Sequence, residues 1–221
     1  MPHASALART MAAFLDQEGH WAEAIALHQA AAHAAHTLNS PDAEAHAVLD
    51  LGWVRRRTGD YPEAAQLAQR AYGRYHTLDN RQNEAWALLE LGQISRETRN
   101  YVKAADLLER SRARFHELGD RKGEAEALAA AGDLQAATIG PGPALATYQQ
   151  ALTLARQINS PLDQAHALEG TANCHATLRH HREAVQSLAE EGTNHSTERS
   201  PEGCDGRVST AVDVARVNSR S

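Results

Sequence analysis

The sequence predicts an all-α solenoid built from about five helix-turn-helix repeats. Three observations support this fold class: the chain is similar to itself at a shift of 40 residues, small residues recur at fixed places, and apolar residues follow helical spacing. The clearest shared position holds alanine in all five copies, at Ala24, Ala64, Ala104, Ala144 and Ala184. Self-similarity at such a period is typical of stacked units that are each too small to bury their apolar face alone.

Residues 45–84 show how one unit is built. Apolar residues recur at helical spacing through its first half, which predicts a first helix that ends near Gly59. Gly59 suits the turn because glycine accepts a positive φ without a steric penalty. Asp60 then stands at the expected N-cap of a second helix that runs to about Leu78. We expect a polar link over 79–83 to lead into the next unit.

A second column of small residues predicts close contact between helices. Gly52, Gly92 and Gly132 align at the 40-residue shift, and Ala12 and Ala172 fill the same column in the outer units. A column restricted to glycine and alanine indicates that two helix backbones approach each other closely.

These units resemble the tetratricopeptide repeat. The residues of the best-matching unit that support the resemblance are Leu51-Gly52, Gly59-Asp60-Tyr61, Ala64 and Ala71. The usual repeat has about 34 residues, and we expect the extra residues in a longer second helix and link. The links over 118–125 and 158–161 are similar to those of actinobacterial regulators, which include antibiotic-pathway activators and signal-transduction NTPases. The resemblance covers about residues 5–188 and implies a right-handed α-α superhelix.

The repeat pattern divides the chain into a leader over 1–4, a solenoid over 5–189 and a disordered tail over 190–221. After Leu188 the sequence is polar and loses helical periodicity, so we expect the fifth unit to have a short second helix and no capping helix. The predicted repeats are 5–44, 45–84, 85–124, 125–164 and a truncated 165–189.

This abrupt change leaves several explanations open. A partner or further chain covers that end, or the chain is a truncated copy of a longer protein, or a reading-frame change near residue 189 produced the tail. An uncapped end would also allow self-association of two copies.

Composition excludes several classes of protein. The formal net charge is -6 with acids and bases interspersed, so no broad basic face is available for direct binding of nucleic acid. Cys174 and Cys204 make no disulfide framework and fit a reducing compartment. No apolar run approaches the roughly 18 residues of a membrane helix, and no signal core precedes the first repeat. We expect a soluble, cytoplasmic protein.

Motifs for catalysis are missing from the sequence. It contains no His-Glu-x-x-His, no Gly-x-Ser-x-Gly and no phosphate loop. The best metal candidate joins Cys174 and His175 to His180 and His181, but this spacing matches no zinc pattern and Cys174 falls in an apolar column. We therefore expect no metal and no cofactor, and an enzyme ranks low among the alternatives.

The resemblance implies that the first helix of each repeat lines a concave face and points one stripe of side chains at a ligand. Helical spacing independently places the members of each set on one helix face. The candidate partner-binding residues are His46, Trp53, Arg56, Arg57, Trp86, Gln93, Arg96, Glu97, Glu126, Asp133, His166 and Asn173.

Two tryptophans and three arginines give this stripe the composition of a binding surface. Large aromatic residues and arginine supply most of the binding energy in protein interfaces. Arg56, Arg57 and Arg96 would suit an acidic segment or a C-terminal carboxylate. The alternative is that Trp53 and Trp86 pack against neighbouring repeats while the arginines are solvated.

The sequence therefore predicts a protein- or peptide-binding scaffold, most simply the repeat region of a bacterial regulator. A peptide-sensing module that changes its superhelical pitch and a nonfunctional fragment of a larger regulator are the alternatives.

Overall fold

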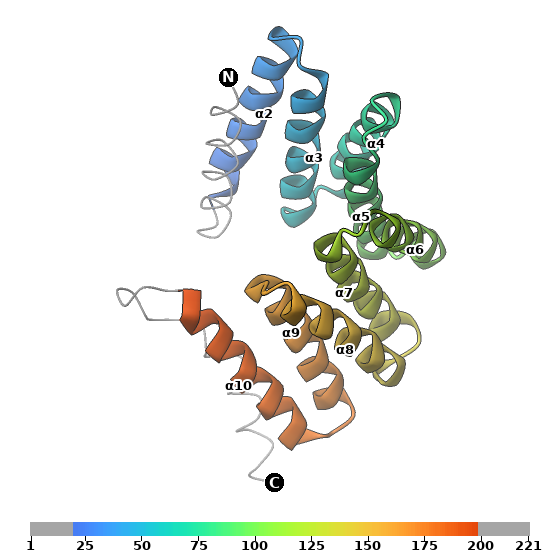
Figure 1. Cartoon of the computed structure of the whole chain (residues 1–221), viewed down its shortest axis with the longest axis vertical. Coiled ribbons are helices and arrows are strands. Elements are labelled where there is room, and N and C mark those ends of the chain that lie inside the picture. Colours follow the sequence, from blue (N-terminus) through green and yellow to red (C-terminus); the bar gives the residue numbers. More distant parts are fainter. Residues whose placement is uncertain (1–19, 199–221) are drawn as a thin grey trace.

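A computed structural model describes residues 20–198 of the chain, with side chains through Glu190. Every regular element in this part of the chain is a helix (Figure 1), as the sequence predicts. The predicted leader, the first helix of the first repeat and residues 199–221 of the predicted tail lie outside the described residues. The helices are α2 (Trp21–Thr37), α3 (Pro41–Arg57), α4 (Tyr61–Thr77), α5 (Arg81–Glu97), α6 (Tyr101–Leu118), α7 (Arg121–Thr138), α8 (Pro141–Gln157), α9 (Pro161–Thr177) and α10 (His181–Glu198).

The helices begin every 20 residues, and the short links between them share two features. Most links contain a residue with a positive φ, such as Gly59 at 85° or Asp79 at 51°, which turns the chain sharply. Several then contain an N-cap: Asp60 accepts a hydrogen bond from the backbone N–H of Glu63 at 3.3 Å. The positive φ predicted at Gly59 and the cap predicted at Asp60 are both confirmed.

The links are shorter than the sequence analysis predicts. The expected link over 79–83 is wrong because α5 begins at Arg81, where Asn80 caps the helix by accepting a hydrogen bond from the N–H of Asn83 at 3.2 Å. The two helices of a repeat are equally long, since α3 and α4 each have 17 residues. The residues by which this repeat exceeds the usual 34 are therefore distributed over both helices. They do not lengthen only the second helix and the link.

Helix α10 continues past the predicted end of the solenoid at 189 and reaches Glu198. It packs on α9, and its 18 residues make it as long as the other helices. Residues 190–198 are thus helical, where the sequence analysis places a tail. The physical reason is that propagating an existing helix costs little, and Glu190 and Glu191 are good helix formers.

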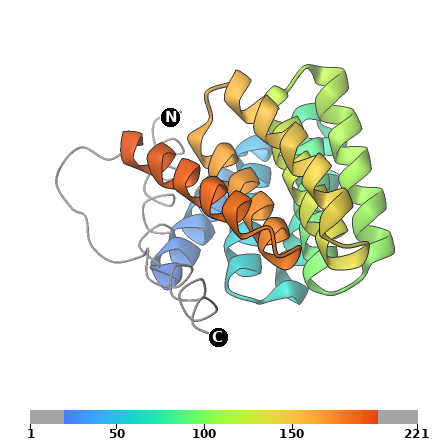
Figure 2. The same ribbon diagram turned by 90° about the horizontal axis from the view of Figure 1, so that it is seen from below.

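The helices form a right-handed superhelix with two layers (Figure 1 and Figure 2). Helices α3, α5, α7 and α9 contact one another in succession and line the inner side of the curve. Helices α4, α6 and α8 form the outer layer. Each repeat therefore contributes one helix to the inner face.

Small residues let the inner and outer helices approach closely, as the sequence predicts. A Cβ added at Gly92 would lie only 2.7 Å from Cδ2 of Leu108, so a larger residue in this contact between α5 and α6 would force the Leu108 side chain to shift. The shared alanine column is completely buried in four units, at Ala24, Ala64, Ala104 and Ala144.

Candidate functional site on the inner face

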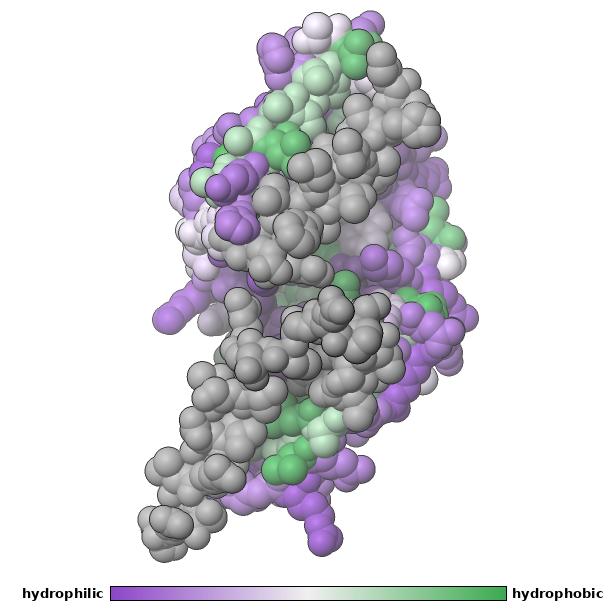
Figure 3. Space-filling view, turned by 90° about the vertical axis from the view of Figure 1, so that its left-hand side faces the viewer, coloured by the Kyte–Doolittle hydropathy of each residue, from purple (hydrophilic) through white to green (hydrophobic). Residues whose placement is uncertain are grey.

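All twelve candidate residues lie on the four helices that line the inner side of the curve. Figure 3 shows the molecule from the left-hand side of Figure 1; the coloured surface visible there is hydrophilic around its outline, with a hydrophobic strip in the upper part and hydrophobic patches lower down. Eight of the twelve are partly buried, so most candidates also contribute to packing. The four exposed candidates are Arg57, Glu97, His166 and Asn173.

An exposed cation lies between two indole rings at the N-terminal end of the inner face. The guanidinium carbon of Arg57 is 5.5 Å from the ring centroid of Trp53 and 5.7 Å from that of Trp21. Such cation–π contacts hold the charge in place without neutralising it. Trp53 and Arg57 therefore form one aromatic and cationic surface together with Trp21, which the sequence analysis did not include.

His46 and Trp86 occupy equivalent positions and pack against rings of the outer helices. The Trp86 ring lies 4.8 Å from that of Phe115, and the His46 ring lies 5.5 Å from that of Tyr75, both edge-on. Phe115 and Tyr75 are completely buried. Phe115 belongs to the same repeat as Trp86, so this contact gives the half-buried Trp86 ring a packing role within its own unit.

Arg56 is held by a neighbouring repeat. Its Nε lies 2.8 Å from Oε1 of Glu90 on α5, and the two side chains are only 12% and 7% exposed. Burial raises the pKa of Glu90, and this effect is larger than the lowering caused by the charge of Arg56. A carboxylate this deeply buried needs its partner, so Arg56 serves the contact between α3 and α5.

Arg96 and His166 meet at the carboxylate of a third candidate, Asp133. Arg96 Nη2 lies 3.6 Å from Asp133 Oδ2, His166 Nε2 lies 3.4 Å from the same oxygen, and the Tyr148 hydroxyl donates to Asp133 Oδ1 at 2.6 Å. Burial alone would raise the pKa of Asp133, but the contacts with His166, Tyr148 and Arg96 outweigh it and lower that pKa. The hydrogen bond to Asp133 in turn raises the pKa of His166. Helices α5, α7, α8 and α9 are thus joined through a single ionised group.

The remaining polar candidates differ in how firmly they are held. Arg96 Nη2 also lies 2.7 Å from Oε1 of Glu97. Gln93 and Asn173 form no side-chain hydrogen bond within the described part of the chain, so their amides are available to a ligand.

Carboxylates crowd around Glu126 on α7. Burial raises the pKa of Glu126 to about 7, and the charge of Asp163 on α9 adds to the rise. Lys122 Nζ opposes it from 3.9 Å. One oxygen of Asp163 is buried and has no hydrogen-bond partner among the described residues. The carboxyl group of Glu126 is therefore harder to ionise than that of an exposed glutamate.

Replacing Glu126 by glutamine is expected to stabilise the protein at alkaline pH. The cost of ionising Glu126 in the fold is absent below its ordinary pKa of 4.5, grows as pH rises toward 7, and is complete above that. At about 1.4 kcal/mol per pKa unit, this rise sets a ceiling of about 3.5 kcal/mol on the cost of ionising Glu126. The side chain is 30% exposed, so after solvent screening we expect a gain of about 1–2 kcal/mol at pH 8.5 and none at pH 4.

Urea unfolding at the two pH values measures this difference. Glu117→Gln is the matched control, because Glu117 is exposed on α6 and its substitution should give the same stability at both. A Glu126→Gln variant that is no more stable than the parent at pH 8.5 would contradict the assigned cause.

The sequence analysis missed Glu90 and Tyr148, which both shape the inner face. Tyr148 belongs to the outer helix α8 and reaches Asp133 by packing over Gly170. A Cβ added at Gly170 would lie 2.3 Å from the Tyr148 ring. The sequence signal for this contact is Gly170 itself. Two of the other repeats carry a carboxylate at the equivalent position, and one of these is Glu90.

The suggested cysteine and histidine cluster does not form a metal site. Cys174 is 3% exposed, and burial raises the pKa of its thiol, as expected for a small residue of the apolar core. The rings of His175 and His180 lie 5.8 Å apart. Within the described residues, no group of three or more histidine, cysteine or acidic side chains could hold a metal ion.

The sequence matches no protein-family model and no curated protein. Solved structures do match it. BtubC from P. vanneervenii is 16% identical with a TM-score of 0.65, over 92% of this chain and 86% of that one. The kinesin light chain TPR-like repeats of Podosopora anserina are 16% identical with a TM-score of 0.59, over 90% of this chain and 100% of that one.

A third match is the Rap conjugation regulator of plasmid pLS20, whose structure is a complex with the Phr* peptide. It is 13% identical with a TM-score of 0.76, over 85% of this chain. The present chain covers 52% of that protein, about half its length. Together with the paired helices and the curved inner face, these matches define the class: the fold is that of a TPR-like solenoid.

Proposed function

We propose that this chain is a scaffold that binds a protein or peptide along its inner face, as the repeat region of an actinobacterial regulator. The observation that supports this best is the continuous inner face of α3, α5, α7 and α9, on which Arg57, His166 and Asn173 remain exposed. An extended ligand lying across these helices would meet side chains from every described inner helix.

The charges on this face suggest the chemistry of the partner. Arg56 and Arg96 are engaged by carboxylates of neighbouring repeats, so an acidic segment or C-terminal carboxylate of the ligand would be held by Arg57. Farther along the face, the carboxylate of Glu126 on α7 favours a basic group, whereas that of Asp133 is already held by Arg96, His166 and Tyr148. A ligand with opposite charges at its two ends would therefore bind in one direction.

A peptide-sensing module is the second candidate function. The Rap regulator with a TPR-like fold was solved with a peptide bound, and this similarity supports a peptide as the partner. In a sensor, binding would change the superhelical pitch, so small-angle scattering with and without the ligand separates a sensor from a rigid scaffold.

Selection from a displayed random peptide library tests the proposed site. Peptides selected on the parent protein should lose at least tenfold in affinity for an Arg57→Ala, His166→Ala double variant, since arginine contacts dominate binding energy. The control is Arg112→Ala on the outer helix α6, which should bind like the parent. Equal binding by parent and double variant would remove these residues from the site.

The proposal also covers the cellular location of the protein and the association of its copies. None of the described helices is both long enough and apolar enough to cross a membrane. We propose a cytoplasmic protein whose copies self-associate through the C-terminal end, which sedimentation across a concentration series would test.

A further inference from the structure

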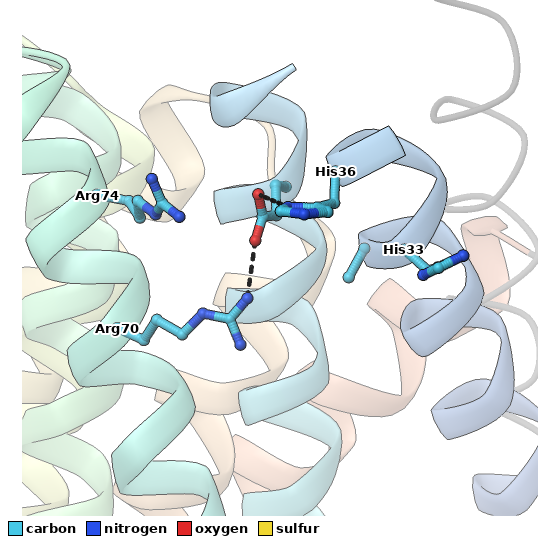
Figure 4. A pocket seen from close by; sticks show the side chains of 6 residues that line it. His33, His36, Arg70 and Arg74 are labelled. Carbon is cyan, nitrogen blue, oxygen red and sulfur yellow. Dashed lines mark hydrogen bonds and ion pairs between the residues drawn. The ribbon is translucent and has the colours of Figure 1, made fainter. Parts of the chain in front are cut away.

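The outer side of the solenoid contains a hollow between α2 and α4. Its volume is about 480 Å³, and every lining residue except Ala32 has a charged or polar side chain, whose carbon atoms form much of the wall. Figure 4 shows Arg70 and Arg74 extending from α4 toward the side where His36 of α2 lies, while the His33 ring is turned away. The lining residues are Ala32, His33, His36, Glu44, Arg70 and Arg74.

Positive charge exceeds negative charge in this hollow. Glu44 is the only acid of the lining, and both its oxygens are occupied: Arg70 Nη2 donates at 2.8 Å and His36 Nδ1 lies at 3.2 Å. Arg74 forms no ion pair with any residue that the structure describes. The Arg74 guanidinium therefore faces the hollow beyond ion-pair distance of Glu44, although its charge helps to lower the pKa of that carboxyl, and the Nε2 atom of His36 is open to a ligand.

The next repeat shows that this excess is specific to the first hollow. Between α4 and α6 both equivalent arginines are paired, Arg114 with Glu84 at 2.9 Å and Arg110 with Asp106 at 3.1 Å. The position of Asp106 is occupied by Gln66 in α4. Because Gln66 carries no charge, Arg70 turns to Glu44 and Arg74 is left unpaired.

We propose that the hollow between α2 and α4 binds a phosphate monoester, either free or carried on a side chain. The guanidinium of Arg74 can donate two parallel hydrogen bonds to phosphate oxygens, and Nε2 of His36 donates a third when the imidazole is protonated, since Nδ1 already donates to Glu44. A phosphate monoester has a charge near -2 and three terminal oxygens, which match both groups. A carboxylate would satisfy Arg74 alone. This site is separate from the inner face and does not depend on the proposed function there.

Titration calorimetry with O-phosphoserine on the full chain tests the proposal. We expect saturable binding at one site per chain, weaker by about tenfold or more in Arg74→Ala, because a charge-assisted hydrogen-bond pair is lost. Gln66→Asp should weaken binding equally without removing any arginine, since the introduced carboxylate would draw Arg70 from Glu44 and leave Glu44 to Arg74. Helical circular dichroism confirms that both variants fold.

Three controls separate this site from general charge attraction and from the inner face. Arg110→Ala removes an equally basic residue that is already paired, and it should bind phosphoserine like the parent. Arg57→Ala alters only the inner face and should also bind like the parent. Free glutamate should bind at least tenfold more weakly than phosphoserine.

The source of the phosphate follows from two further probes. Equal affinity for inorganic phosphate and for a phosphoserine peptide identifies a free phosphate ligand, and tighter binding of the peptide identifies a phosphorylated side chain. The proposal is overturned if phosphoserine does not saturate, if glutamate binds as tightly, or if Arg110→Ala loses as much affinity as Arg74→Ala.

Discussion

Replacing Arg56 by alanine is expected to lower the free energy of unfolding by about 3–5 kcal/mol, the cost of leaving a buried charge without its partner. Arg56 and Glu90 are 12% and 7% exposed and join α3 to α5 across a repeat boundary. Without Arg56, the carboxylate of Glu90 must remain buried and unpaired or take up a proton. Urea unfolding measures the loss. Arg57→Ala is the control, because Arg57 is exposed and its cation–π contacts are worth about 0.5–1 kcal/mol.

The loss should depend on pH in a direction set by Glu90. Burial raises the pKa of Glu90, and removing Arg56 takes away the charge that opposes this rise. The Arg56→Ala variant should therefore be least destabilised at acid pH, where Glu90 is protonated, and increasingly destabilised as pH rises. Adding Glu90→Ala should recover most of the loss, since Ala130 is the natural residue at the equivalent position. A loss below about 1 kcal/mol at pH 8 would show that water reaches the pair.

The repeat, the helical hairpins and the buried small residues could be predicted from the sequence because they are local or strictly periodic. Gly59 and Asp60 specify their turn within a few residues of chain, and the alanine column recurs without exception. The sequence analysis predicts the link over 79–83 too long because this polar run resembles a loop, although Asn80 caps α5 in the way that Asp60 caps α4.

The availability of the inner-face arginines could not be predicted, because their partners lie at offsets that the 40-residue alignment does not show. Arg56 pairs with Glu90 and Arg96 with Asp133, so each contact joins two different columns of neighbouring repeats. Such offsets depend on how far each inner helix is shifted along the next one. That shift follows from three-dimensional packing, which the alignment does not contain.

Replacing Gly170 by alanine is expected to lower the free energy of unfolding by about 2–4 kcal/mol, although alanine is the better helix former by about 1 kcal/mol. The added Cβ would lie 2.3 Å from the Tyr148 ring, which is 3% exposed and held by its hydrogen bond to Asp133. The ring cannot move away without breaking that bond and leaving a buried hydroxyl unpaired. His166 would then be the remaining close partner of Asp133 besides Arg96.

Two comparisons assign the effect to this contact. Gly73→Ala in α4 is the matched control: nothing lies within 4 Å of the added Cβ, so this variant should gain about 0.5–1 kcal/mol. In a Tyr148→Ala background, Gly170→Ala should change from destabilising to neutral or stabilising, because the ring that it would strike is gone. Urea unfolding of the four variants and the parent measures both. If Gly170→Ala remains equally destabilising without Tyr148, the close approach of α8 and α9 is not the reason for glycine at this position.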